Sequence, residues 1–197
     1  MGKSGAYISA LAVAWALFSG TASAKTPTTD TLKIDVTASI SERCGVQALG
    51  PRVKDGGRID RATVLAFNFK LDCNTPLKIG VAAQNGALRL VSENNAVSDS
   101  AGFAVVKKYN VGLSFMTDQD GLVDAGDCAS EKLNAADPTC KFYGAQPGMG
   151  FSPGRQTTAI GREGALTISW DGEDAEPVRH AAGAYQETLT IVVAPRT

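Results

Sequence analysis

The stretch YQETLTIVVAPRT, residues 185–197, decides the fold class of this chain. It is rich in β-branched residues, and its side chains alternate between apolar and polar along much of its length, a pattern typical of a half-buried strand. The apolar face holds Tyr185, Leu189, Ile191 and Val193. A strand at the end of a chain has one open side unless another segment pairs with it, and an apolar open side invites a second polypeptide. We therefore expect an all-β domain whose last strand is an accepting edge.

A second alternating stretch lies near the amino end, at residues 31–40. One face carries Leu32, Ile34, Val36 and Ala38, and the alternation continues to Ile40. The other face is polar throughout, so the period of two is strict. These two ends predict a protein that exchanges strands with its neighbours. Because the alternation has no break, the boundary between an extension and the first domain strand stays open.

Between the two ends, strand signals dominate. Residues 63–73 alternate with four large apolar side chains inward: Leu65, Phe67, Phe69 and Leu71. Residues 77–83 and 87–91 flank an Asn-Gly step, which predicts a hairpin. Further strands are expected at 103–106, 109–115, 165–170 and 184–194. Short strands with Gly-rich turns favour an antiparallel sandwich, with a barrel as the nearest alternative.

Residues 117–153 do not fit the strand pattern and are expected to form a long loop, with a helical turn within 129–136. Four cysteines are present, which permits three pairings. Pairing of Cys44 with Cys73 and of Cys128 with Cys140 is favoured because each pair is local in sequence. Zinc is a weak rival, since the chain has no Cys-x-x-Cys motif and a single histidine.

Residues 1–24 have the features of a secretory signal: Lys3, an apolar run over 7–18, and the small residues of 22–24 before the expected cleavage site. Removal would leave 173 residues (197 minus 24), enough for one domain with a core. The net charge is −1, which gives no reason to expect nucleic acid or an anionic membrane as partner. We expect an exported protein that contains disulfides and is not inserted in a membrane.

No catalytic motif is found, so the chain is not expected to be an enzyme, and no cofactor is expected. His180 is the sole histidine and is expected to lie in a solvated loop. Four aspartates could resemble a calcium loop: Asp118, Asp120, Asp124 and Asp127. The glycine and glutamate that such a loop requires are replaced by Val123 and Ala129, so a solvated acidic loop is favoured and no metal is expected. Four aromatic residues are expected in the core: Phe67, Phe69, Tyr109 and Trp170.

The order of these features resembles a known family. A signal peptide, an alternating strand, Cys44, a Phe-rich strand that ends in Cys73 and the closing AGAYQETLTI at 182–191 are similar to subunits of chaperone–usher pili. The likeness is greatest to the archaic, spore-coat-protein-U-type fimbrial proteins. Residues 31–40 also resemble the N-terminal segment of alpha-type fimbrial major subunits. The resemblance covers most of the mature chain, but residues 117–153 have no counterpart in it.

This resemblance implies an incomplete immunoglobulin-like antiparallel β-sandwich, completed by a donor strand from a neighbouring subunit. Residues 1–24 would be the signal peptide, 25–38 the donor extension and 39–197 the pilin domain. The donor residues would be Leu32, Ile34, Val36 and Ala38, and the accepting edge Tyr185, Leu189, Ile191 and Val193. The implied partners are a periplasmic pilus chaperone, an outer-membrane usher and other pilin copies. The implied destination, after export through the periplasm, is a cell-surface fimbrium that supports adhesion or biofilm formation.

Two other functions fit the same composition. One is a self-contained secreted β-sandwich that binds a carbohydrate or a surface ligand, in which both end strands pair within the monomer. The other is a secreted hydrolase on a β scaffold. Deletion of residues 25–38 separates them from strand exchange, because only an exchanging subunit loses assembly and keeps its fold.

Overall fold

The computed structural model describes residues 35–91, 102–135, 137, 139–173 and 178–196. The chain divides into two units, Met1–Ser39 and Ile40–Thr197, and each is described by itself. In the first unit the described residues 35–39 are exposed and form no strand. The predicted signal peptide, together with Leu32 and Ile34, lies outside the described residues.

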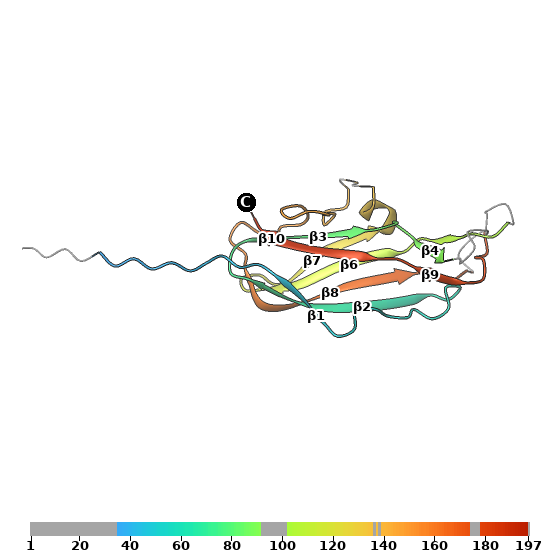
Figure 1. Ribbon diagram of the computed structural model, residues 1–197, viewed down its shortest axis with the longest axis horizontal. Helices are drawn as coiled ribbons and strands as arrows, with labels where there is room; N and C mark the ends of the chain where they lie inside the picture. The colour runs from blue at the N-terminus through green and yellow to red at the C-terminus, as the bar shows by residue number, and fades with distance from the viewer. Residues whose placement is uncertain (1–34, 92–101, 136, 138, 174–177, 197) are drawn as a thin grey trace, which may run out of the picture. The chain divides into compact units, whose positions relative to one another are not determined.

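The second unit contains a five-stranded antiparallel sheet in the order β1-β2-β8-β6-β7 (Figure 1). Its strands are β1 (Val46–Leu49), β2 (Thr63–Cys73), β6 (Asn110–Thr117), β7 (Gly121–Ala129) and β8 (Ala159–Trp170). The alternation predicted for β2 is confirmed, because Phe69 and Leu71 are buried while Val64 and Lys70 are exposed. A short 3-10 helix, η2 (Ser130–Leu133), follows β7 and agrees with the helical turn expected there.

The remaining strands form two smaller antiparallel sheets. One pairs β3 (Leu77–Ala83) with β10 (Leu189–Pro195), and the other has the order β5-β4-β9. The members of the latter are β4 (Leu88–Val91), β5 (Val106–Lys107) and β9 (Ala184–Gln186). β3 and β4 follow each other in sequence, as do β9 and β10. The two small sheets therefore continue one another along the same pair of segments.

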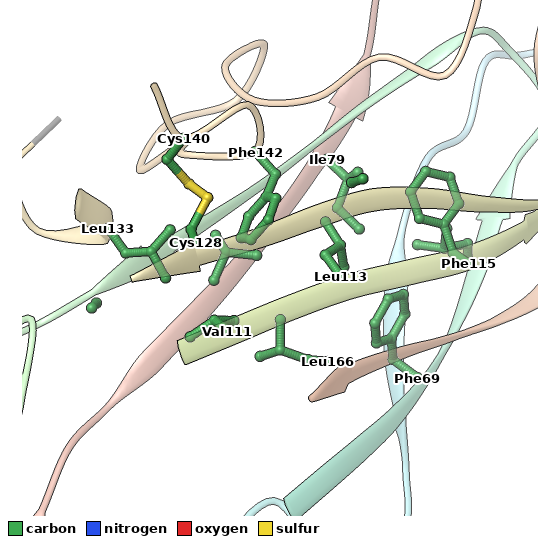
Figure 2. Close-up of a cluster of buried hydrophobic side chains, with 14 of the residues drawn as sticks. Phe69, Ile79, Val111, Leu113, Phe115, Cys128, Leu133, Cys140, Phe142 and Leu166 are labelled. Atoms are coloured by element: carbon green, nitrogen blue, oxygen red, sulfur yellow. A yellow bond between two sulfur atoms is a disulfide. The ribbon is translucent and has the colours of Figure 1, made fainter. Parts of the chain in front are cut away.

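Apolar side chains of the five-stranded sheet pack against those of β3 in a single core (Figure 2). Ile79 and Val81 of β3 are fully buried, as are Val111 and Phe115 of β6. The expectation of an all-β protein with antiparallel sheets and a sandwich core is confirmed. Of the aromatic residues expected in the core, Phe69, Tyr109 and Trp170 are buried, whereas Phe67 is only half-buried.

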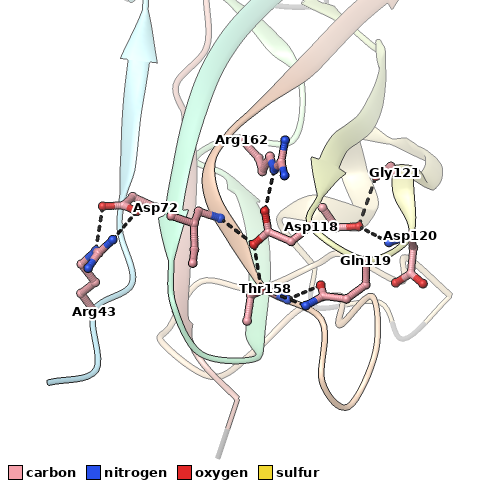
Figure 3. Close-up of polar contacts among 10 residues, drawn as sticks. Arg43, Asp72, Asp118, Gln119, Asp120, Gly121, Thr158 and Arg162 are labelled. Carbon is pink, nitrogen blue, oxygen red and sulfur yellow. Dashed lines mark hydrogen bonds and ion pairs between the residues drawn. The ribbon is translucent and has the colours of Figure 1, made fainter. Parts of the chain in front are cut away.

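Both disulfides join the cysteines that the sequence positions favour: Cys44 with Cys73, and Cys128 with Cys140. The first bridge lies beside backbone hydrogen bonds between residues 43–45 and 72–74: Asp72 N–H donates to Gly45 O at 3.0 Å and Asn74 N–H to Arg43 O at 3.1 Å. Arg43 also pairs with the Asp72 carboxylate at 2.9 Å (Figure 3). The chain is therefore held to the domain from about residue 41 onward.

The hairpin predicted at Gln84-Asn85-Gly86 is wrong. β3 and β4 do not pair with each other; Ala83 at the end of β3 pairs with Leu189, and Arg89 of β4 pairs with Gln186. Both strands thus pair with the same carboxyl-terminal segment, and residues 84–88 bulge out between them. Gly86, with a φ of +72°, provides the backbone conformation that this bulge needs.

The expectation of a strandless loop over residues 117–153 is also wrong in its first part. Residues 121–129 form β7, whose alternation is disturbed by a register shift at Leu113/Ser114 and by Gly126 in a left-handed conformation. Such a bulge interrupts the period of two that reveals a strand in sequence. The later part of the segment, residues 140–152, lies along the outer edge of β3 and is named the edge cover below.

Candidate functional site

The outer side of β10, away from β3, is the open edge of the two-stranded sheet. Gln84 N–H donates to Thr188 O and Arg196 N–H to Pro76 O, so the even-numbered residues of this segment face β3. The N–H and C=O groups of Leu189, Ile191 and Val193 therefore point to the open side. In the described part of the chain no strand pairs with them there.

The side chains of the same three residues are only partly buried. Leu189, Ile191 and Val193 pack on the core but keep exposed area, whereas their partners on β3, Val81 and Ile79, are fully buried. Two apolar residues of the facing sheet, Leu65 and Phe67, are likewise half-buried. The inner faces of both sheets are thus incompletely covered, as expected of a sandwich with room for another strand.

Charge distinguishes this side of the domain from the opposite edge. β10 carries no charged residue, and neither does β1, which lies near it without pairing. Val46 and Leu49 of β1 are 39% and 38% exposed. The far edge strand β7 instead exposes Asp124 and Asp127. Charges on an edge strand discourage pairing with another chain, so β7 is protected in a way that β10 and β1 are not.

Tyr185, predicted to share this apolar face, lies on β9 and not on β10. Its hydroxyl donates to Ala181 O at 2.9 Å and lies 3.1 Å from Ala104 O, so these two backbone carbonyls fix the position of the side chain. The sequence pattern predicted β9 and β10 as one strand, because no turn residue separates them. The structure brings together Leu189, Ile191 and Val193 on β10 and places Tyr185 on the neighbouring strand.

Glu187, at the break between β9 and β10, was not singled out by sequence reasoning. Its carboxylate accepts hydrogen bonds at 3.1 Å from the backbone N–H groups of Asn85 and Ala87, which fixes the bulge at residues 84–88. Burial raises the pKa of the nearby Tyr109, and the charge of Glu187 raises it further. The only feature of the sequence that could have indicated this role is a single glutamate within a segment rich in strand-forming residues.

The predicted donor segment is described from residue 35 onward. Val36 is 88% exposed and Ile40 is 87% exposed, and Ala38 is exposed as well. No strand forms over residues 35–40, because an isolated alternating segment needs a partner to pair with. The backbone hydrogen bonds at residues 43–45 mark where the segment leaves the domain.

The residues considered for other chemistry lie elsewhere. His180 is 9% exposed, so the expectation of a solvated side chain is wrong; its backbone N–H donates to Glu173 at 2.9 Å and its Nε2 lies 3.1 Å from Val106 O. Asp118 begins the β6–β7 turn, whereas Asp124 and Asp127 lie on β7. Within the described ranges, no group of three or more His, Cys, Asp or Glu side chains is placed to hold a metal ion.

A shallow pocket of about 200 Å³ lies where β6, β8 and η2 meet. It is lined by Lys108, Tyr109, Asn110, Ala129, Glu131, Trp170 and Asp171. Lys108 and Glu131 form an ion pair at 3.5 Å, and Trp170 is only 8% exposed. A buried indole offers no face for a sugar ring to stack on, so this pocket does not favour the carbohydrate-binding alternative.

Asp118 ties the β6–β7 turn to the start of β8 (Figure 3). Its carboxylate accepts from Thr158 Oγ1 at 2.7 Å, from Ile160 N–H at 3.0 Å and from Arg162 Nε at 2.6 Å. Partial burial alone would raise the pKa of Asp118, but these donors outweigh it and hold the pKa below its ordinary value of 3.8. The ionised form is therefore the one that stabilises the fold.

We predict that Asp118→Ala lowers the free energy of unfolding by about 1–2 kcal/mol at pH 7. A lowered pKa gives stability that is present above the unfolded-state value and lost as pH falls through the folded-state value. The difference between wild type and variant should therefore shrink below about pH 4. Urea unfolding at pH 7, 4 and 3 measures it, with the exposed Asp171→Ala as the control. A difference independent of pH would contradict this role.

No family model matches the chain, and no curated protein matches it. A solved chain from work on a chaperone–tip adhesin complex in CFA/I fimbriae biogenesis is similar, with 12% identity and a TM-score of 0.34. The match covers 78% of this chain and 42% of that one, so this chain spans less than half of its length. A likeness this distant carries no argument about function. In the described residues, no helix is long and apolar enough to cross a membrane.

Proposed function

We propose that this protein is a structural subunit of a surface pilus, assembled when the amino-terminal segment of one copy pairs with the open edge of the next. The observation that carries the proposal is the uncharged edge of β10, where Leu189, Ile191 and Val193 are half-buried and pair with no strand on their open side in the described part of the chain. The same chain carries an alternating apolar segment in which Val36 is 88% exposed. A site and an occupant of matching chemistry thus occur in one sequence.

Pairing on this edge would both complete the backbone hydrogen bonding of β10 and cover half-buried apolar side chains. The free N–H and C=O groups of Leu189, Ile191 and Val193 would gain main-chain partners, which supply affinity in strand addition. Alternate side chains of the incoming segment, Leu32, Ile34 and Val36, would cover Leu65 and Phe67 and set the register. Each apolar side chain so buried contributes about 1.5–3 kcal/mol before the cost of ordering the segment.

The proposed occupant is the amino-terminal segment of a second copy, as the family resemblance implies. Each copy then offers one donor segment and one accepting edge. Contacts of this head-to-tail kind do not close on themselves unless the rotation between copies allows a ring, so the expected product is a fibre. The proposed role is structural, without catalysis.

The family resemblance supplies the remaining parts of the proposal. An apolar edge exposed before assembly is an aggregation hazard, so a periplasmic chaperone would cover it until an outer-membrane usher delivers the next subunit. The two disulfides fit an oxidising compartment, in agreement with export. The mature protein would reach the cell surface as part of a fimbrium.

A competing peptide tests the proposal. Mature protein, residues 25–197, should assemble into concentration-dependent oligomers, and an excess of a synthetic peptide of residues 31–40 should reduce them to short species. The same peptide with Ile34→Asp should be at least roughly a hundredfold less potent, since a carboxylate would have to enter an apolar groove at a cost of several kcal/mol. A peptide with Lys33→Asp, changed on the polar face, is the matched control. Equal potency of the two altered peptides would refute the donor assignment.

A further inference from the structure

We infer that the edge cover, residues 140–152, restricts strand addition to one edge of the two-stranded sheet, and that the Cys128–Cys140 bridge holds it in place. β3 would otherwise be a second accepting edge, because Leu77, Ile79 and Val81 are as apolar as the residues of β10. The inference rests on the proposed function for the identity of the partner, an extended alternating segment of a second copy. Whether the edge cover occupies the outer edge of β3 does not depend on the identity of that partner.

Backbone groups on the outer side of β3 are taken by the chain itself. Ile79 and Phe151 exchange two hydrogen bonds, each of 2.9 Å, as residues in paired strands do. Val81 N–H donates to Phe142 O at 2.8 Å, and Gly144 N–H donates to Val81 O at 3.1 Å. Just before the cover, the Asn134 amide donates to Ala83 O at 3.3 Å, so the occupied edge extends to the end of β3.

The backbone of the edge cover lies as close to the backbone of β3 as packing permits. A Cβ added at Gly150 would lie 2.2 Å from Ile79 O, and one added at Gly144 would lie 2.9 Å from the Cα of Gly80. Gly150 also has a φ of +99°, which disfavours other residues. An incoming strand therefore finds no room on this side of β3 while the cover is in place.

Two anchors hold the cover against the core. Phe142 is fully buried, and the Phe151 ring packs edge-on against Phe115 with 6.3 Å between centroids (Figure 2 shows Phe142, Phe115 and the bridge). The bridge ties Cys140, at the start of the cover, to Cys128 on β7, and both are buried. Cutting the bridge removes the covalent link but leaves both aromatic anchors, so the core would persist while the cover opens more readily and excess peptide can displace it.

The consequence concerns the shape of the assembly. One donor segment and one accepting edge per copy give an unbranched fibre. A second accepting edge on β3 would let two donors bind one domain, so fibres would branch or aggregate. The edge cover is thus a device that protects an edge strand, comparable in effect to the aspartates exposed on β7.

The experiment compares the mature wild-type chain with a Cys128→Ser/Cys140→Ser variant, each in excess peptide of residues 31–40. Native mass spectrometry counts bound peptides, and hydrogen exchange follows the amides of Ile79 and Val81. We expect one peptide per wild-type chain and two per variant chain. We also expect the two amides to exchange at least about tenfold faster in the variant without peptide. Gln146→Ala, an exposed change within the cover, is the control and should behave as wild type.

The outcomes separate the inference from the proposed function. Unchanged peptide number and unchanged protection of Ile79 and Val81 in the variant would overturn the inference, as would two peptides on the wild type. No peptide on the wild type and one on the variant would refute acceptance at β10 and support the cover. If the variant does not fold, hydrogen exchange of the wild-type chain with and without peptide tests the inference alone. Peptide must then slow the amides of Ile191 and Val193 and leave those of Ile79 and Val81 unchanged, and slowing at Ile79 and Val81 would overturn the inference.

Discussion

Ile191→Asp should weaken binding of the 31–40 peptide to the open edge about a thousandfold, equivalent to about 4 kcal/mol. Ile191 lies on the inner face of β10, opposite Val81, and its side chain packs on the core beside the space that an incoming strand would fill. A carboxylate there would be removed from water when the strand binds, and no cation faces it on β10. The measurement is a peptide titration with residues 40–197, the unit that contains all described strands.

The matched control is Thr190→Asp, on the exposed face of the same strand, which adds the same charge without burial. It should bind the peptide with nearly wild-type affinity. Since Ile191 is half-buried in the free domain, the thermal midpoint of each variant is measured first, to verify that the acceptor is folded. An Ile191→Asp domain that is folded and binds within about threefold of wild type would contradict the assignment of this edge.

Phe142→Ala should lower the free energy of unfolding by about 3–5 kcal/mol, the range typical of truncating a fully buried phenylalanine. Phe142 is fully buried, and its carbonyl accepts a hydrogen bond from Val81. The substitution leaves a cavity between the edge cover and the core. Denaturant unfolding with both disulfides intact measures the loss.

Phe103→Ala is the control for this prediction, because Phe103 is the same residue type and is 46% exposed. Its truncation should cost less than about 1 kcal/mol. Equal losses for the two variants would mean that the edge cover does not pack on the core as described.

Local pattern predicted the strands whose two faces differ in polarity. β2 and β3 have the bounds expected from sequence, since Leu65 to Leu71 alternate without a bulge and residues 77–83 are bounded by turn residues. Both cysteine pairings followed from short separations in sequence. β10 was found as well, because its central residues 190–193 are all β-branched.

The errors arose where pairing depends on distant segments. The Asn85-Gly86 step has the composition of a hairpin, but the N–H groups of Asn85 and Ala87 donate to Glu187, roughly a hundred residues later in the chain. The register shifts between β6 and β7, and in β8 opposite Leu71 and Asp72 of β2, broke the alternation that reveals a strand. The role of residues 140–152 could not be predicted, because its signal is the close approach of Gly144 and Gly150 to β3, which exists only in the folded chain.

The apolar, unpaired edge of β10 was predicted in part, and its role as an acceptor stays a prediction. The sequence indicated an apolar edge at Leu189, Ile191 and Val193, and the structure places these residues on an unpaired side of β10. The sequence did not indicate that Leu65 and Phe67, on the opposite sheet, would be only half-buried. The periodicity of a strand shows which of its side chains point inward, but not whether another strand covers them.

Size-exclusion chromatography with light scattering, on mature chains that contain or lack residues 25–38, tests strand exchange most directly. Strand exchange predicts a ladder of oligomers for residues 25–197 and a single small species, still folded by circular dichroism, for residues 39–197. A full-length chain that is a stable monomer, and that loses stability on the same truncation, would contradict it. That result would mean that residues 25–38 are a strand of a complete sandwich.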